Sequence, residues 1–235
     1  MIDCTTHHTL AILPLTGNPL GADVNPLTSR IYVASMADSD QGGAFAGVSV
    51  IDATTHRLCA AVPVGHQVPS ASGPVCVKAN PRSNRIYVGG NNPTAVAAID
   101  GGCNCVIASL SIEGQILDIG VNPQTNRILV PDYVTGTLAV INGADHSIVA
   151  TVDGFHNPAG VDVDARADRV YVSHVGMVPI LSATTNRTIG LVPLPGKCFI
   201  ITGGLGGLRV NPFTHRVYLS HQQAGIVFVV EDRPA

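Results

Sequence analysis

Three residues whose side chains bind metals or transfer protons share one position in a repeated sequence. Asp132, His174 and His221 each lie two residues after a short run such as Arg-Ile-Leu-Val or Arg-Val-Tyr-Val. Two imidazoles and one carboxylate are the ligand set of a facial triad, which leaves positions on the metal open for substrate. The same groups suit a general acid and base oriented by a carboxylate. Either chemistry requires that the three side chains lie close together.

Further residues are candidates for a role near these three. His156 precedes the segment of His174, so it is predicted as a fourth ligand or as a base, and His66 lies in a long loop of the same kind. Asp118 is predicted, with Cys76, at the floor of the same pocket. The alternative interpretation is that these polar groups only cap strand ends, since polar clusters mark functional sites only part of the time.

The run that positions these residues belongs to a repeat that fills the chain. Segments such as NPRSNRIYV and NPQTNRILV begin at residues 25, 80, 122, 164 and 211. A period of roughly 40–45 residues is that of a four-stranded propeller blade. Short apolar segments separated by Gly, Pro, Asn and Asp predict four strands in each unit, here named A to D. Residues 1–235 are therefore predicted to form a single propeller domain.

The two ends of the sequence complement each other. The last unit stops after a third strand, AGIVFVVED, whereas the first residues, MIDCTTHHTLAILPLTG, read as the end of a third strand and a whole fourth strand. Such an arrangement leaves no exposed sheet edge. The chain is thus predicted to be an all-β, closed five-bladed β-propeller of four-stranded antiparallel blades, with the last blade completed by the N-terminal strand.

Propeller topology also predicts which histidines share a face. The A–B and C–D turns lie on one face, and the B–C and D–A loops lie on the other, where propellers usually bind ligands. The histidines in turns of the first face are His7, His8, His56, His146 and His215. Those in loops of the second face are His66, His156, His174 and His221.

Charged residues recur on the predicted innermost strands, at Asp23, Lys78, Asp162 and Arg209. Alternation directs them into the channel if their apolar neighbours pack between blades. We expect Asp23 to pair with Lys78 and Asp162 to pair with Arg209, because charges removed from water need partners. Asp118 has no evident charged partner at its own level.

The repeat unit resembles that of the YVTN-type β-propeller family. The resemblance rests on segments such as NPQTNRILV, followed by strands such as GVSVID and RLCAAVPVG, and it covers nearly the whole chain. It implies a propeller fold, although many relatives have about seven blades. Through lyase-like and lactonase-like relatives it also implies an elimination or ring-opening reaction with a histidine as base. Similar propellers act as surface proteins or binding scaffolds, so the resemblance leaves the function open.

Composition excludes several classes of partner. Only 12% of residues are charged, the net charge is −3 and tryptophan is absent, so no nucleic acid partner is predicted. No apolar run approaches the ~18 residues that span a bilayer. The first residues, MIDCTTHHTL, lack the basic and apolar regions of a signal peptide. No membrane partner is predicted, and the compartment stays undetermined.

The six cysteines are too few for a disulfide scaffold in a chain of this length. Cys103 and Cys105 are separated by one residue, whereas zinc and redox motifs usually have two residues between their cysteines. Cys59 lies in an apolar stretch and is predicted to be a small buried hydrophobic residue.

The leading hypothesis is a small-molecule enzyme, either a lyase or an oxidoreductase. Asp132, His174 and His221 would bind a divalent metal ion, with iron, zinc, copper or manganese as the candidates. His156, His66 and Asp118 would be the catalytic residues around it. The alternative is a non-catalytic propeller that binds a protein or a glycan through the same loops.

Overall fold

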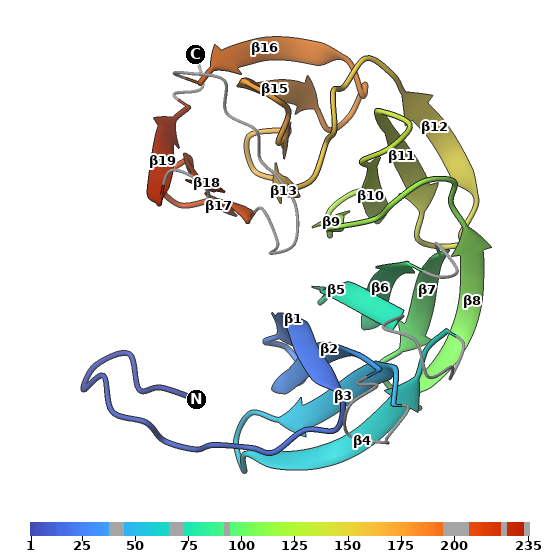
Figure 1. Cartoon of the computed structure of the whole chain (residues 1–235), viewed down its shortest axis with the longest axis vertical. Helices are drawn as coiled ribbons and strands as arrows, with labels where there is room; N and C mark the ends of the chain where they lie inside the picture. Colours follow the sequence, from blue (N-terminus) through green and yellow to red (C-terminus); the bar gives the residue numbers. More distant parts are fainter. Residues whose placement is uncertain (38–44, 66–72, 92–94, 195–206, 222–224, 233–235) are drawn as a thin grey trace.

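The computed structural model describes residues 1–37, 45–65, 73–91, 95–194, 207–221 and 225–232, and for His221 it describes the backbone only. These residues form 19 strands in five antiparallel sheets, which follow one another around a common centre (Figure 1). From the centre outward, the first blade contains β1 (Asn18–Asn25), β2 (Arg30–Met36), β3 (Gly47–Asp52) and β4 (Arg57–Pro63). The second contains β5 (Gly73–Asn80), β6 (Arg85–Asn91), β7 (Ala95–Asp100) and β8 (Cys105–Ser111).

The remaining three blades repeat this order. The third contains β9 (Gly120–Asn122), β10 (Arg127–Asp132), β11 (Thr137–Asn142) and β12 (Ile148–Val152). The fourth contains β13 (Val161–Asp164), β14 (Arg169–Val172), β15 (Met177–Ser182) and β16 (Thr188–Pro193). The fifth contains β17 (Leu208–Asn211), β18 (Arg216–His221) and β19 (Ile226–Glu231). The predicted five-bladed propeller with mainly four-stranded antiparallel blades is confirmed.

The turns that join the strands are built from one repeated set of bonds. At the end of each inner strand an Asn or Asp side chain accepts a hydrogen bond from the N–H two residues later, as Asn25 does from Leu27 at 3.1 Å. The A–B turn then closes on a residue with positive φ. These residues are Ser29, Asn84, Asn126, Asp168 and His215. The first residue of the C–D turn donates to the carbonyl of that residue, as Ala53 does to Ser29 at 2.9 Å. These bonds place the A–B and C–D turns side by side.

The core lies between the blades, where apolar faces of neighbouring sheets meet. Tyr32 and Val50 of the first blade pack in one cluster with Ile86 and Val88 of the second, and each of the four is at most 1% exposed. Alternation along each strand supplies an apolar residue to both faces of the blade, because neighbouring blades cover both faces. The apolar residues of the repeated Arg-Ile-Tyr-Val run therefore pack against the neighbouring blades on both faces of the sheet.

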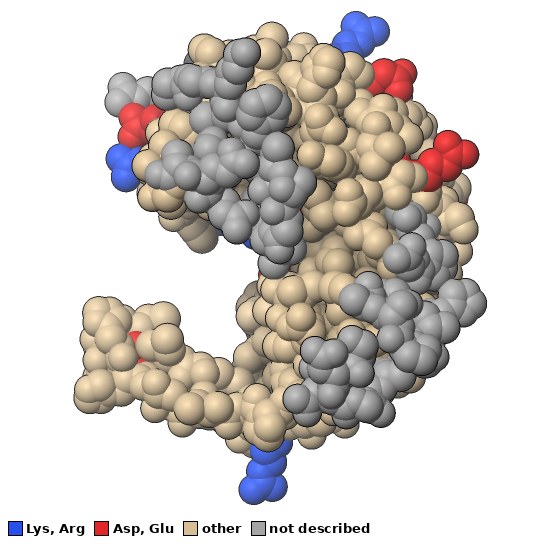
Figure 2. Space-filling model, viewed as in Figure 1, with Lys and Arg blue, Asp and Glu red and all other residues tan. Residues whose placement is uncertain are grey.

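The last blade differs from the prediction. Its described strands number three, and the N-terminal segment does not pair with β19. Figure 2 shows an open notch between that segment and the rest of the molecule, and in Figure 1 the fifth blade lies across the notch from it. The prediction that the N-terminal strand completes the last blade is therefore wrong for this structure.

The N-terminal segment still has the local geometry that the repeat predicts. His7 has a φ of 58°, as His56 has a φ of 57°, and Ile2 forms an isolated bridge with Thr9. Ala11 and Leu13 of this segment line one open hollow together with Ile31 and Val33 of the first blade. In the interior of the ring a preceding blade covers that face of the sheet. The apolar side chains of Ile2, Leu10 and Ile12 are 65, 54 and 86% exposed, so the segment is not packed as the fourth strand of a blade.

Candidate functional site

The structure brings His156 and His174 together at the start of the fourth blade. His156 lies in the loop between β12 and β13, and His174 lies just after β14. The backbone N–H of Val175 donates to the carbonyl of His156 at 3.2 Å, which joins the two loops. The two imidazole rings are stacked, with centroids 5.3 Å apart and planes inclined by 19°. The ring of Phe155 meets His174 edge-on at 6.5 Å.

The environment of His174 is unusual for a polar residue. Its imidazole is buried, with 6% of the residue exposed. Neither ring nitrogen has a hydrogen-bond partner among the described residues. Loss of hydration lowers the pKa of His174, and a positive charge on His156 lowers it further. The imidazole is therefore neutral at pH 7 and offers a nitrogen lone pair without a partner.

Asp132 makes a set of backbone hydrogen bonds, while its predicted role as a metal ligand stays a prediction. It ends β10, is 2% exposed, and its Oδ1 accepts hydrogen bonds from the N–H groups of Gln115, Val134 and Thr135 at 3.0, 3.0 and 3.2 Å. Such a carboxylate holds two loops in place, because it satisfies backbone donors that are removed from water. This is the capping role that the sequence left as the alternative.

Of the three predicted metal ligands, the structure describes the side chains of Asp132 and His174 but not that of His221. The described part of the chain contains no group of three or more His, Cys, Asp and Glu side chains that could hold a metal ion. The backbone of His221 pairs with Ile226 at the end of β18, and its side chain lies outside the described residues. His66 also lies outside them. A ligand role for these two histidines stays a prediction.

The channel contains ion pairs, but the partners differ from the predicted ones. Arg209 donates to Asp118 at 2.8 Å, and Lys78 lies 3.7 Å from Asp162. Each pair joins blades that are not neighbours, the third with the fifth and the second with the fourth. Asp23 instead accepts a bond from the backbone N–H of Ala79 at 2.8 Å. The sequence order suggested adjacent partners, whereas five inner strands that meet at one axis bring opposite blades within reach.

Asp118 and Cys76 line a common hollow, but none of the candidate histidines is among its described lining residues, so a shared pocket stays a prediction. The hollow has a volume of about 40 Å³, and Arg209 also lines it. Asp118 is 7% exposed, and loss of hydration raises the pKa of its carboxyl while the guanidinium of Arg209 opposes that shift. Burial raises the pKa of the Cys76 thiol well above its usual value, so this cysteine is not a nucleophile at neutral pH.

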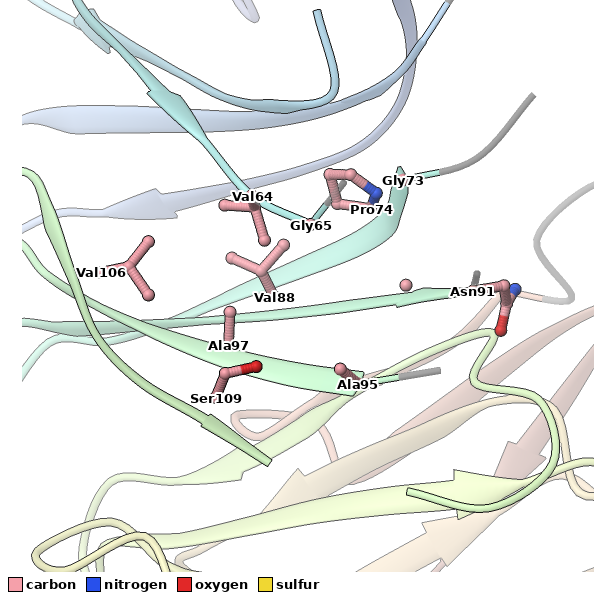
Figure 3. Close-up of a pocket in the computed structure, with 11 residues that line it drawn as sticks. Val64, Gly65, Gly73, Pro74, Val88, Asn91, Ala95, Ala97, Val106 and Ser109 are labelled. Atoms are coloured by element: carbon pink, nitrogen blue, oxygen red, sulfur yellow. The ribbon is translucent and has the colours of Figure 1, made fainter. Parts of the chain in front are cut away.

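A larger cavity was not foreseen from the sequence. It measures about 130 Å³ and lies between the first and second blades. Figure 3 shows the side chains of Val64, Val88, Ala97 and Val106 around a single space. Small side chains in the sequence could have indicated this cavity. Gly90, for example, occupies the strand position that Asp132 has in the next blade.

Two cysteine predictions are corrected. Cys103 and Cys105 form a disulfide in the C–D turn of the second blade, although their spacing did not suggest a redox pair. Cys59 is exposed, because it lies on the outermost strand of its blade, where the outer face has no neighbour. No helix long and apolar enough to cross a membrane occurs in the part of the chain that the structure describes.

Comparisons with known proteins identify the fold alone. No family model and no curated protein matches the sequence. Among solved structures, hydrazine synthase of Kuenenia stuttgartiensis has 14% sequence identity and a TM-score of 0.60, over 100% of this chain and 89% of that one. At this identity the similarity supports a β-propeller and carries no statement about activity.

Proposed function

We propose that this chain is a small-molecule enzyme whose reaction centre includes His174 and His156, at the end of the ring that bears the B–C and D–A loops. The observation that supports this most is the buried imidazole of His174, which has two unpartnered nitrogens among the described residues and is stacked on His156. A buried polar group without a partner costs about 1–3 kcal/mol. A bound ligand that supplied the partner would recover that cost.

A divalent transition metal, iron, zinc, copper or manganese, is the cofactor that we propose. The donor set fits, because a neutral imidazole nitrogen is a common ligand of such ions and the lowered pKa of His174 keeps it neutral. His174 would hold the ion, and His66 and His221 are candidates to add to it. When bound, the ion would polarise a substrate oxygen or activate water.

The residues of the chain supply the other steps. His156 is exposed beside buried His174, so its imidazole is placed to accept a proton from a substrate that enters from solvent. Asp132 keeps the two loops at the end of β10 in position through its three backbone bonds. Asp118 remains a candidate acid or base at the channel floor. A lyase or an oxidoreductase is the reaction class that we propose.

We also propose that the chain is a divergent member of the YVTN-type propellers. Support comes from the five Asn-Pro or Asp-Ala turns with positive φ at the same place in every repeat. Membership would favour a lyase reaction over redox chemistry.

Elemental analysis of untagged protein purified without chelators tests the proposal. We expect about one equivalent of metal per chain in the wild type, and background content in His174→Ala and His221→Ala. The matched control is His56→Asn, because Asn104 and Asn186 occupy the equivalent left-handed turn position. Metal-free protein that also fails to bind added zinc or copper would overturn the proposal, as would equal loss in the control.

A second candidate function is a non-catalytic scaffold that binds a protein or a glycan. The cavity in Figure 3 favours it, because Val64, Val88, Ala97 and Val106 make a lining suited to an apolar side chain of a partner. In that case Ala97→Leu, which fills the cavity, would abolish binding of the partner. His174→Ala would leave binding of the partner unchanged. The metal content would stay at background in every variant.

A further inference from the structure

The disulfide between Cys103 and Cys105 is exposed, and the turn that contains it is complete without it. Both cysteines are exposed, and they are separated by a single residue, Asn104, which has a φ of 55°. The turn begins after β7 and ends as β8 starts. The two sulfur atoms thus lie at the surface, where a thiol from solution can approach either of them.

The equivalent turn of the first blade shows what holds this structure. There the N–H groups of Thr54 and Thr55 donate to Asp52 Oδ1, and the N–H of His56 donates to the Asp52 carbonyl. That turn has no cysteine pair. Its φ at His56 is 57°, within a few degrees of the φ at Asn104.

The second blade has the same bonds at the same positions. The N–H groups of Gly102 and Cys103 donate to Asp100 Oδ1 at 2.7 and 3.3 Å, and the N–H of Asn104 donates to the Asp100 carbonyl at 2.8 Å. The N–H of Gly101 anchors the turn to the carbonyl of Asn84 at 2.9 Å. The backbone network fixes the conformation, so the disulfide is redundant for folding of this turn.

We infer that the Cys103–Cys105 disulfide is a site of thiol–disulfide exchange with dithiol substrates, separate from the histidine site. A thiolate of the dithiol attacks one of the two sulfurs, so that the S–S bond breaks and a mixed disulfide forms. The released cysteine thiolate takes up a proton. The second thiolate of the substrate then attacks the substrate sulfur of the mixed disulfide. The remaining cysteine leaves as a thiolate and takes up a proton. The substrate becomes a disulfide and loses two electrons, and Cys103 and Cys105 become two thiols.

The local fold favours such a cycle because both redox forms fit it. Reduction removes no backbone hydrogen bond, and the side chains of Thr55 and Arg57 occupy the two equivalent positions in the first blade without any link. The blade therefore stays folded when the bond opens. A disulfide that closes a long loop and holds the fold would instead lower the melting temperature when it is reduced.

Native-state reduction tests the inference. Oxidised protein is mixed with dithiothreitol without denaturant, quenched with iodoacetamide and digested for mass spectrometry. We expect alkylation of both Cys103 and Cys105, oxidation of one dithiol per chain, and a melting temperature within about 2 °C of the oxidised protein. The Cys59→Ser variant is the control for exposed thiols and should give the same yield.

Two outcomes would overturn it. One is a disulfide that is reduced only after denaturant is added. The other is native reduction that lowers the melting temperature by several degrees, which would make the bond a structural one. The Cys103→Ser/Cys105→Ser variant gives a second readout: it should melt like the wild type and oxidise no dithiol. The reduced wild type supplies the same comparison if that variant does not fold.

Discussion

At the scale of single residues, histidine takes two different roles in this chain. His56 and His146 lie in turns with φ of 57° and 61°, a conformation in which Asn serves equally well. His174 instead has its ring buried against His156 and Phe155. The difference lies in what surrounds each ring, since both kinds of histidine follow a strand end in the sequence.

The pKa of His174 leads to a prediction about pH. Burial lowers this pKa, so the folded state binds the proton more weakly than the unfolded state does. The stability of the neutral form is fully present above the ordinary pKa of about 6.5 and is lost as the pH falls below it. We expect the free energy of unfolding in urea to drop between pH 8 and pH 5, and to drop less in His174→Leu. An equal drop in both proteins would show that His174 is not the group involved. The His56→Asn variant should behave as the wild type.

Asp132 gives a prediction that separates a structural role from a ligand role. Asp132→Ala leaves the N–H groups of Gln115, Val134 and Thr135 without their acceptor, which we expect to cost about 2 kcal/mol or more in urea denaturation. Asp132→Asn keeps an oxygen at the Oδ1 position and should cost clearly less. Metal content, measured on the same samples, should not change in Asp132→Asn. If Asp132→Asn lost metal while its stability was unchanged, Asp132 would be a metal ligand together with the histidines.

At the scale of elements, each blade is held by turns that need a left-handed residue. The C–D turns contain His56, Asn104, His146 and Asn186 at that position. Asn tolerates this conformation well, whereas a β-branched side chain does not. The repeat therefore restricts residue type at the turns as strictly as in the core.

This restriction predicts the effect of two substitutions at one turn. His56→Val should lower the free energy of unfolding by about 1–2 kcal/mol, because Cβ branching is strained at a φ of 57°. His56→Asn should be close to neutral. Urea denaturation of the two variants side by side measures the difference. Equal stabilities would mean that the turn changes conformation to accommodate valine.

At the scale of the whole molecule, two ion pairs cross the channel and connect opposite blades. Lys78 and Asp162 are each buried to a similar degree, with side-chain exposures of 14% and 16%. Arg209 is more exposed than Asp118, at 49% against 10%. The pairs act between sheets that are not neighbours in the ring, so they help to set how the blades are arranged around the axis.

Removal of one partner should therefore destabilise the ring. Arg209→Met leaves Asp118 buried without its cation, and we expect a loss of about 2 kcal/mol, between the values for exposed and buried pairs. The double variant Arg209→Met/Asp118→Asn buries no charge and keeps an acceptor for the N–H of Val161, so it should recover most of the loss. A double variant less stable than the single one would contradict this account.

The fifth blade also shows how the environment of a residue depends on the whole molecule. Val227 and Val229 on β19 are 61% and 56% exposed, whereas Val48 and Val50, at the equivalent positions of β3, are at most 1% exposed. The sequences of the two strands are alike. Only the second blade, which covers β3, makes the difference, and β19 faces the notch (Figure 1).

The number of blades, the strand order within a blade and the turn residues could all be predicted from the amino-acid sequence. These features follow from interactions over a few residues and from alternation, and the repeat reports them five times. It also placed Asp118 and Cys76 at one hollow, because strand register fixes which side chains share a face.

The groups that meet across the ring could not be predicted in this way. The stacking of His156 on His174 and the pairing of Arg209 with Asp118 each depend on the distance and angle between sheets. Those quantities come from packing of many side chains between blades, and no local pattern encodes them. For the same reason the sequence identified candidates for chemistry, whereas the loss of solvent around His174 became visible only in the folded ring.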